Sequence, residues 1–350
     1  MDTARPRRPT LDTVAGVVGV SRATVSNAYN RPDQLSAALR ERILAEAARL
    51  GYAGPDPVAR SLATRHSAAV GFLLGQSLTA AFSDPALSIV LDGLATTVDG
   101  HDHSLVLMAG SAGPRAETVA RAQADVVVAY SLPEDAPGLA AARARGLPLV
   151  VVDQPEVPGV ARVGVDDEGG ARVAAGHVRA LGHERVAVLT FALHTDGVTG
   201  LADRARLRST PPGVAGRRVR GYLEVLGEAQ VWECPLSDRS LGRAGARELL
   251  SHPDRPTALL CTSDELAFGA LTAARDLGLR VPEDVSVVGF DDVPAAEHAE
   301  PPLTTVRQPL AEKGRQAGEL ALSLLDGARP SAPVRLPVSL IERASTARLT

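Results

Sequence analysis

The chain has 350 residues, 45% of them hydrophobic, so it is long enough to form two or three domains with substantial cores. Its two cysteines, Cys234 and Cys261, suggest neither a disulfide framework nor a metal-binding motif, and no apolar stretch has the length of a signal peptide or a membrane span. These features predict a cytoplasmic protein that needs no metal or other cofactor and has no contact with a membrane.

The net charge of −4 is unevenly distributed along the chain. Residues 1–65 hold ten arginines and six acidic residues, a charge of +4, which leaves −8 for the remainder. A basic N-terminal part on an acidic body is typical of a protein that binds DNA through the smaller part only. Lys313 is the single lysine, and the P-loop pattern GxxxxGK[ST] is absent, which disfavours P-loop and Schiff-base enzymes.

Three short helices are predicted near the N-terminus. Residues 1–9, rich in arginine and proline, are expected to form a disordered arm. Thr10 is suited to cap a helix over Leu11–Val18, Gly19 to end that helix in a left-handed conformation, and Ser21 to cap the next one. A third helix is expected between Ser36 as its N-cap and Gly51 just beyond its end. The pattern predicts a helix-turn-helix domain over residues 10–53.

The second of these helices has two different faces. At 3.6 residues per turn, Val25 and Tyr29 fall on one side with Ala28 beside them. The opposite side is slim and polar and consists of Arg22, Ala23, Ser26, Asn27 and Asn30. Small residues with a few hydrogen-bond donors are what a helix needs to enter the major groove of DNA.

Residues 54–67 are predicted to be a linker. It begins with Gly54-Pro55-Asp56-Pro57 and continues into one possible helical turn over Val58–Ala63. Pro57 favours a helix start, but a helix this short is expected to be mostly unfolded on its own.

After His66, short apolar runs alternate with amphipathic helices. Continuous apolar strands separated by helices predict parallel sheets covered by helices on both faces. This pattern continues for too long to fit one sheet, so we expect two α/β lobes with a cleft between them. The predicted strands are Val70–Leu74, Leu105–Met108, Val126–Ala129, Leu149–Val152, Val186–Thr190, Ala258–Thr262 and Val285–Phe290.

Three blocks of sequence carry a family resemblance, and their order and spacing make it specific. The blocks are Val14-Ala15 … Gly19-Val20-Ser21 … Thr24-Val25-Ser26 … Asn30 with Leu50-Gly51-Tyr52; Ala59-Arg60-Ser61-Leu62; and Leu181–Arg185, Ser263–Ala267, Pro282–Asp292 and Pro302–Val306. With them the chain resembles the LacI/GalR family of transcriptional repressors over nearly its whole length. The resemblance implies a helix-turn-helix domain, a hinge helix, and a two-lobed core like that of type I periplasmic sugar-binding proteins, crossed three times by the chain.

The resemblance also assigns DNA contacts. Arg22, Ala23 and Asn27 match positions that read base edges, and Arg22 is suited to bind guanine O6 and N7. Relatives often carry arginine at the position of Asn27, so the usual operator sequence is in doubt here. The alternative is that Arg22 and Asn27 are merely solvated surface. Phosphate or further DNA contacts are implied for Ser21, Thr24, Ser26, Asn30, Thr10 and Ala59.

Leu62 matches the hinge leucine that, in such repressors, inserts into the minor groove at the centre of a palindromic site. An apolar wedge unstacks a base step and kinks the DNA. A lone leucine in a helical turn is ordinarily a packing residue, but the linker has no predicted core beside it. Because the turn is marginal without DNA, it is also suited to act as a switch.

Candidate ligand-binding residues lie where the predicted strands end. Asp153 and Asp264 follow two of the strands, at the edge where open α/β sheets bind ligands. By resemblance, these two and Arg218 match ligand-contacting positions suited to sugar hydroxyls. Ser263 and Asp264 are equally suited to cap a helix over Glu265–Leu277. For Arg218, a plain surface position is the lesser alternative. Asp291, Asp292 and the aromatic residues Phe191, Tyr130 and Phe82 are weaker candidates.

Two features fit the family imperfectly. The segment Phe191–Gly216 is long and rich in glycine, proline and arginine, and we expect it to border the cleft. Aromatic residues make up only 3% of the chain, so the stacking platform common in sugar sites is not obvious. The class of ligand therefore stays open at this stage.

The leading hypothesis is a ligand-responsive repressor, associated with the nucleoid, that binds a near-palindromic DNA operator as a homodimer and has a sugar-like effector. The chain ends without a leucine heptad tail, so no tetramer built on one is expected. The core is predicted over residues 68–350, with one lobe of about 68–165 plus 299–328 and the other of about 166–298 plus 329–350. The alternatives are a solute-binding protein and an α/β enzyme; neither a signal peptide nor a GxGxxG, GxSxG or HExxH motif supports them.

Overall fold

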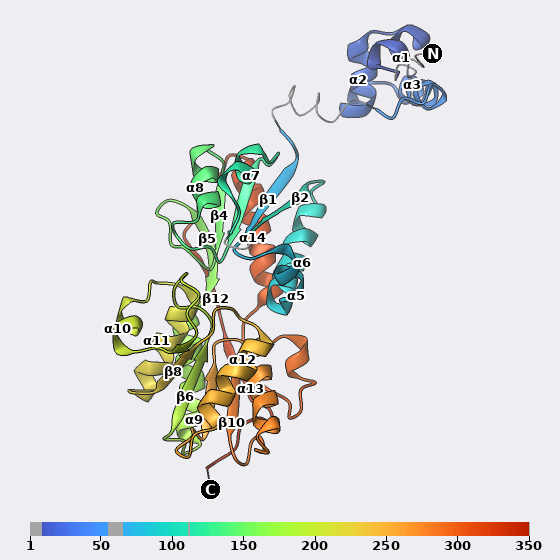
Figure 1. Cartoon of the computed structure of the whole chain (residues 1–350). Helices are drawn as coiled ribbons and strands as arrows, with labels where there is room; N and C mark the ends of the chain where they lie inside the picture. The colour runs from blue at the N-terminus through green and yellow to red at the C-terminus, as the bar shows by residue number, and fades with distance from the viewer. Residues whose placement is uncertain (1–8, 55–65, 111–112, 350) are drawn as a thin grey trace, which may run out of the picture. The chain divides into compact units, whose positions relative to one another are not determined.

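The computed structural model describes residues 9–54, 66–110 and 113–349 (Figure 1). The chain divides into two compact units, an N-terminal unit up to Ser67 and a body from Ala68 onwards.

The N-terminal unit contains three helices, and the side chains that cap them are those expected from the sequence. Thr10, Ser21 and Ser36 each accept a backbone N–H from the residue three positions later. Gly19 ends the first helix with a φ of 74°, a left-handed conformation that glycine adopts without strain. The elements are α1 (Leu11–Val18), α2 (Arg22–Asn30), the 3₁₀ turn η1 (Pro32–Gln34) and α3 (Ala37–Arg49).

A small apolar core holds the three helices together. Val25 and Ala28 of α2 are fully buried against Val14 of α1 and Ile43 of α3. Burying these side chains fixes which face of α2 points outward, because positions three and four apart share one side of a helix.

The body is built on two separate sheets. The first, in the order β12-β5-β4-β3-β1-β2, is parallel throughout. The second, in the order β13-β11-β10-β9-β6-β8-β7, has five parallel strands with an antiparallel strand at each edge. The first sheet comprises β1 (Ala69–Leu74), β2 (Ser104–Ala109), β3 (Val126–Tyr130), β4 (Leu149–Val152), β5 (Ala161–Val165) and β12 (Val334–Leu336). The second comprises β6 (Val186–Thr190), β7 (Gly200–Leu201), β8 (Gln230–Glu233), β9 (Ala258–Cys261), β10 (Ser286–Asp291), β11 (Thr304–Arg307) and β13 (Ser339–Ile341).

Helices cover both faces of each sheet, as the continuous apolar strands predict. Neighbouring residues of β1 illustrate this, since Phe72 belongs to the core under one layer of helices and Leu73 to the core under the other. The first sheet and its helices form the first lobe, and the second sheet and its helices form the second. The helices of the first lobe are α5 (Leu78–Ser83), α6 (Pro85–Asp99), α7 (Ala116–Arg121), α8 (Pro137–Ala144) and α14 (Leu310–Leu325). Those of the second are α9 (Asp167–Ala180), α10 (Arg204–Ser209), α11 (Val214–Leu226), α12 (Arg239–Leu250), α13 (Asp264–Asp276) and the 3₁₀ turn η2 (Pro294–Ala296).

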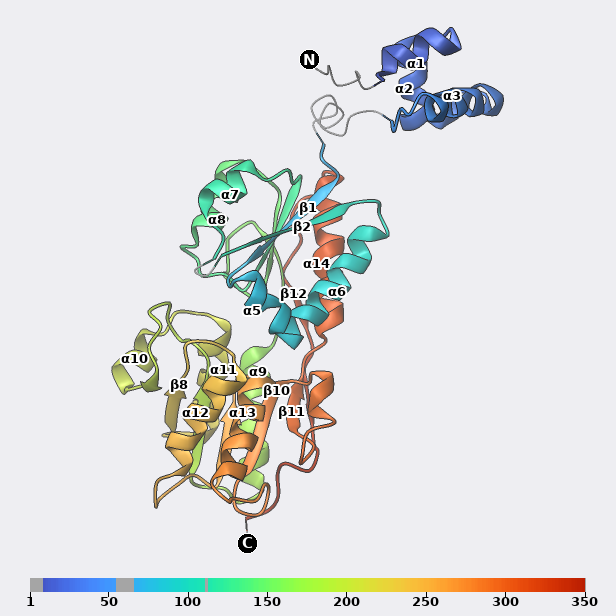
Figure 2. The ribbon, with the colours of Figure 1, turned by 45° about the vertical axis from the view of Figure 1, so that its right-hand side comes forward.

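Helices α6 and α14 lie side by side on the first sheet, as Figure 2 shows. Their backbones approach so closely that a Cβ atom at Gly314 would stand 1.9 Å from the carbonyl oxygen of Val90. In the second lobe, α12 packs beside α13 on one face and α9 beside α11 on the other.

The chain passes between the lobes three times, but two of the predicted segment boundaries were wrong. Residues 304–307 form β11, which pairs with β10 and therefore belongs to the second lobe, not the first. Residues 334–336 form β12, which pairs with β5 in the first lobe, not the second. The crossings therefore follow β5, β11 and β12. Both misplaced strands are short and lack a long apolar run, so only their pairing partners reveal which lobe they join.

Candidate DNA-binding surface and the polar network between the lobes

Helix α2 presents the polar face that its sequence predicts. Arg22, Ala23 and Asn30 are exposed, and Ser26 and Asn27 are partly exposed, whereas Val25 is fully buried. The outward face is free of large apolar side chains, so a DNA groove could approach the helix closely.

Side chains on this face have only weak or local partners. Asn27 Nδ2 donates to Gln34 Oε1 at 3.1 Å, and the Arg22 guanidinium lies 3.7 Å from the Asp12 carboxylate. The Arg22 and Asp12 side chains are 68% and 67% exposed. Exposed ion pairs contribute little to stability, so Arg22 is available for a stronger partner. The predicted contacts Ala59 and Leu62 lie outside the described residues.

In the body, polar side chains gather where the strands of the two lobes end. Asp153 follows β4 with a φ of 65°, and its carboxylate lies 2.8 Å from Lys313 Nζ on α14. Lys313 is 1% exposed and also donates to Gln308 Oε1 at 2.6 Å. The single lysine of the chain is thus a buried cation that fixes an aspartate, a role that no sequence motif indicates.

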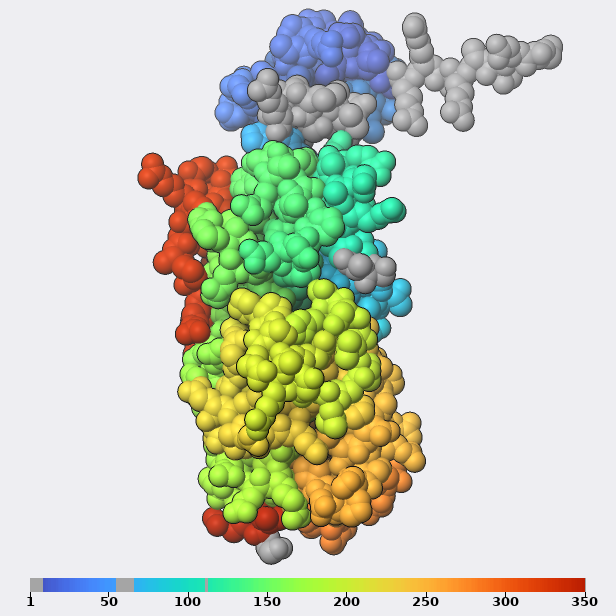
Figure 3. All heavy atoms as spheres, turned by 60° about the vertical axis from the view of Figure 1, so that its left-hand side comes forward, coloured from blue at the N-terminus to red at the C-terminus, as the bar shows by residue number. Residues whose placement is uncertain are grey.

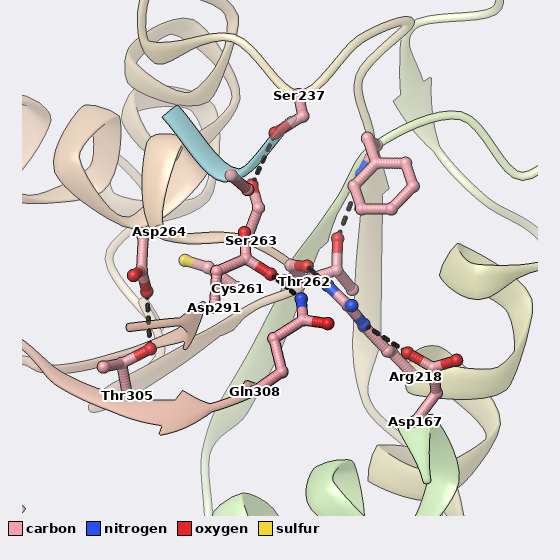
Figure 4. A network of polar contacts seen from close by, with 12 residues as sticks. Asp167, Arg218, Ser237, Cys261, Thr262, Ser263, Asp264, Asp291, Thr305 and Gln308 are labelled. Atoms are coloured by element: carbon pink, nitrogen blue, oxygen red, sulfur yellow. Dashed lines mark hydrogen bonds and ion pairs between the residues drawn. The ribbon is translucent and has the colours of Figure 1, made fainter. Parts of the chain in front are cut away.

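The same network continues into the second lobe through Gln308. Gln308 Nε2 donates to Asp291 Oδ1 at the end of β10, at 2.5 Å. Arg218 of α11 lies 3.3 Å from the same oxygen and donates its Nε to Asp167 Oδ1 at 2.9 Å. Figure 4 shows Arg218 between Asp167 and the strand ends, where it also donates to the carbonyl oxygen of Thr262 at 2.7 Å.

Arg217 closes the network back to the first lobe. Its Nε donates to Asp167 Oδ2 at 3.1 Å, and its Nη2 donates to the backbone oxygen of Asp153 at 3.4 Å. Its buried Nη1 has no hydrogen-bond partner among the described residues. We call the set Asp153, Lys313, Gln308, Asp291, Arg218, Asp167 and Arg217 the interlobe ring.

Burial and charge pull the two acidic groups of the second lobe in opposite directions. Burial raises the pKa of Asp291 to about 6, although Arg218 opposes the shift. Burial also acts to raise the pKa of Asp167, but the guanidinium groups of Arg218 and Arg217 more than offset it, and that pKa is lowered. Asp167 is therefore the firmly ionised partner of the two arginines.

Asp264 is placed differently from the other predicted ligand contacts. Its side chain is fully buried, and its two oxygens accept hydrogen bonds from Thr305 Oγ1 and the backbone N–H of Val293. Burial raises its pKa well above the usual value. Ser263 caps α13 as predicted, but Asp264 does not; it is the first residue of that helix and joins it to β11 instead.

Phe191, one of the three aromatic candidates, is only partly buried at the end of β6. Its ring packs against the apolar cores on both sides of the second sheet, and its backbone N–H donates to Thr262 Oγ1 at 3.2 Å. It therefore lies close to Arg218, which contacts the same threonine through the carbonyl oxygen.

Comparison with known proteins identifies the family of the chain. Residues 10–54 match the model of bacterial regulatory proteins of the lacI family, and residues 175–346 match that of the periplasmic binding protein-like domain. An HTH-type transcriptional regulator of Mycobacterium tuberculosis is 45% identical over 329 residues, which cover 90% of this chain and 91% of the relative. The chain belongs to the lacI family. It is a DNA-binding transcriptional regulator, and its family consists of regulators rather than enzymes.

Other members of the lacI family are similar over most of their length. The HTH-type transcriptional regulator IpsA of Corynebacterium glutamicum is 41% identical over 332 residues, 91% of each chain. The solved structure of a CelR–cellobiose complex is 30% identical, with a TM-score of 0.68, over 97% of this chain and 100% of that one. The lac repressor dimer bound to operator and the anti-inducer ONPF is 27% identical, with a TM-score of 0.78 and the same coverage.

For this lacI family member, the sequence indicates Asp153, Arg218 and Asp291 as site residues but not the groups that connect them. Asp167, Arg217, Gln308 and Lys313 carry no motif. One signal was available, because Lys313 lies on the same side of α14 as the buried residues Leu310 and Ala317. A lone lysine in an apolar stripe indicates a buried partner of opposite charge.

Two further classes of site receive no support from the part of the chain that the structure describes. No helix there is both long and apolar enough to cross a bilayer. No group of three or more His, Cys, Asp or Glu side chains is arranged there to hold a metal ion.

Proposed function

We propose that this regulator is a homodimeric repressor whose affinity for a near-palindromic operator is controlled by a small ligand bound between its two lobes. The observation that carries the proposal is the exposed polar face of α2 on a capped, well-packed helix. Such a helix is preorganised, so little conformational entropy is lost when it enters the major groove. The protein would act in the cytoplasm, on the nucleoid.

Direct base readout is assigned to α2. Arg22 is suited to grip a guanine, and Ala23 and Asn27 to complete the base contacts. Contacts that position the helix on the phosphates are proposed for Thr10, Ser21, Thr24, Ser26, Asn30 and Ala59, with Leu62 as the minor-groove wedge. One such helix reads too few bases for a specific site, which favours a two-fold dimer on a two-fold operator. The related lac repressor, a dimer bound to its operator, is a precedent.

A neutral, hydroxyl-rich effector such as a carbohydrate fits the interlobe ring. In the ring Lys313 is paired with Asp153, and both arginines are paired with Asp167. An anionic or cationic ligand would add a net charge to a buried ring whose charges are already paired with one another, which is unfavourable. Hydroxyl groups can instead share the free lone pairs and the unpaired Arg217 Nη1. The CelR–cellobiose complex is a related protein with a sugar.

Five of the candidate ligand contacts differ in how well the geometry supports them. Asp153, Arg218 and Asp291 belong to the ring, and Phe191 stands beside it, so these four remain proposed contacts. Both oxygens of Asp264 already accept hydrogen bonds. Its proposed contribution is therefore to hold β10 and β11 in place rather than to bind the ligand with a free carboxylate.

The proposal is tested by selecting the operator from random DNA with the full-length protein and measuring its affinity by gel shift. Arg22→Ala is expected to weaken operator binding by about 1–3 kcal/mol and to relax specificity at one position in each half-site. Arg49→Ala, which removes an exposed arginine from the far end of α3, serves as the control. Leu62→Ala tests the proposed wedge. Enrichment of no DNA sequence, or equal affinity of all variants, would refute the DNA mechanism.

The effector is sought by screening neutral sugars against their phosphorylated forms for compounds that change operator affinity. A neutral compound is expected to act where its phosphorylated counterpart does not. If only charged compounds act, the assignment of a neutral effector is wrong even though the regulator assignment stands.

A further inference from the structure

Helix α11 begins without a cap of its own. Its N-cap residue is Gly213, which has no side chain to accept the free backbone N–H groups of the first turn. The acceptor comes instead from the other lobe, where Gln154 Oε1 lies 2.6 Å from the backbone nitrogen of Val214. A residue of the first lobe therefore caps a helix of the second.

The contact leaves little room beside Gly213. A Cβ atom at Gly213 would stand 2.8 Å from Gln154 Oε1, so an alanine there would push the Gln154 amide away from the position that it now takes. A second contact supports it one turn later, where Arg217 Nη2 reaches the backbone oxygen of Asp153 at 3.4 Å. Figure 3 shows the segment that leads into α11, in yellow-green, lying against the green first lobe.

The segment before α11 is itself held firmly, so the helix start has a fixed position in the second lobe. Arg206 of α10 pairs with Asp196 and with Glu233, a side chain that is fully buried at the end of β8. Glu233 also accepts the backbone N–H of Leu193 at 2.7 Å. A change in the angle between the lobes would therefore move Gln154 away from α11 rather than carry the helix start with it.

We propose that Gln154 is an interlobe latch: it caps α11 while the lobes are closed and leaves the helix uncapped when they open. Because α11 carries Arg217 and Arg218, the latch positions both arginines toward Asp167 and Asp291. It thereby sets the balance between the open and closed forms on which the effector acts. The inference rests on the proposed function only in that the effector enters between the lobes.

The expected size of the effect follows from the value of a helix cap. Loss of one cap shifts an equilibrium by about 1 kcal/mol, which is about fivefold in the ratio of closed to open molecules. Replacing Gln154 with glutamate keeps the acceptor oxygens and adds a negative charge at the positive end of the helix, so Gln154→Glu is expected to stay closed.

The test measures the separation of the lobes in the full-length protein without any effector. Two exposed positions are used, Ala144 on α8 in the first lobe and Ala244 on α12 in the second. The substitutions Ala144→Cys and Ala244→Cys introduce two cysteines, and each of these carries one nitroxide spin label. Labelled chains are diluted with unlabelled ones, and distances are measured by pulsed electron paramagnetic resonance. Both native cysteines are buried, which limits background labelling.

Gln154→Ala and Gly213→Ala disrupt the same contact from its two sides. Each is expected to raise the ratio of open molecules, with long distances, to closed ones about fivefold. Gln154→Glu should restore the closed population. Glu156→Gln is the control, because Glu156 pairs with Arg162 of its own lobe at 2.8 Å and should leave the distances unchanged. The latch is refuted if Gln154→Ala and the unsubstituted protein have the same distance distribution. This readout needs neither operator nor effector, so its failure is distinguishable from failure of the proposed function.

Discussion

The buried pair between Arg218 and Asp167 offers a direct test of how the second lobe is held together. Arg218→Met removes the charge but keeps a flexible apolar stem, which can still pack on the Phe290 ring that the guanidinium now covers at 3.7 Å. The Arg218 and Asp167 side chains are 5% and 1% exposed. Removing one partner of such a pair costs about 3–5 kcal/mol, because the other charge stays buried with weaker compensation.

The same two helices provide a matched control. Arg172 of α9 and Glu224 of α11 form a second ion pair at 2.8 Å, but their side chains are 40% and 63% exposed. Water screens that pair, so Arg172→Met is expected to cost no more than about 1 kcal/mol. The two substitutions remove the same charged group, but Arg218 is buried and also contacts Asp291 and the carbonyl oxygen of Thr262, whereas Arg172 is partly exposed.

The assay is thermal unfolding of the full-length protein followed by the fluorescence of Trp232, the only tryptophan of the chain, which lies on β8 in the second lobe. With an unfolding entropy of about 2.1 cal/mol/K per residue, a body spanning Ala68–Thr350 should lose about 5–8 °C for Arg218→Met and less than about 2 °C for Arg172→Met. Equal shifts in the two variants would show that the buried pair is screened as the surface pair is, and the argument from burial would be wrong.

Two further predictions concern the body. Burial raises the pKa of Asp291 to about 6, so between about pH 4 and 6 the folded state keeps a proton that the unfolded state has lost. The free energy of unfolding therefore falls as the pH rises through that window. Asp291→Asn should remove up to about 3 kcal/mol of this pH dependence, measured by urea unfolding from pH 4 to 7; an unchanged profile would contradict the assignment. Gly314→Ala should destabilise the protein by more than about 2 kcal/mol through a clash with Val90, whereas Gly176→Ala in an open part of α9 should stabilise it by about 0.5–1 kcal/mol in the same urea assay. Effects of the same sign would contradict this prediction.

Much of the fold could be predicted from the sequence because the signals are local. The capping residues Thr10, Ser21 and Ser36 and the glycines at the helix ends act within a few residues of their own position. The strands made only of apolar residues or nearly so, such as β4 and β6, are predictable from composition alone. In contrast, β11 and β12 are defined by their pairing partners, and no local pattern says which sheet they join.

The interlobe ring shows the same division between local and long-range information. Asp153 was found because it follows a strand that was easy to predict. Its partner Lys313 lies 160 positions away in sequence, and Gln154 is separated from Val214 by 60. Such contacts depend on how two lobes meet, which neither periodicity nor spacing encodes.

Gln308 has a particular place in the ring because it lies in a crossing between the lobes. It follows β11 of the second lobe and precedes α14 of the first, and both ends of its amide are engaged. The oxygen accepts from Lys313, and the nitrogen donates to Asp291. A rotation of one lobe against the other must change at least one of these two bonds. A ligand shifts an equilibrium only by the difference in its affinity for the two states. An effector bound beside Gln308 therefore needs no long pathway to sense the lobe angle, since a change at the crossing alters the ring that it contacts.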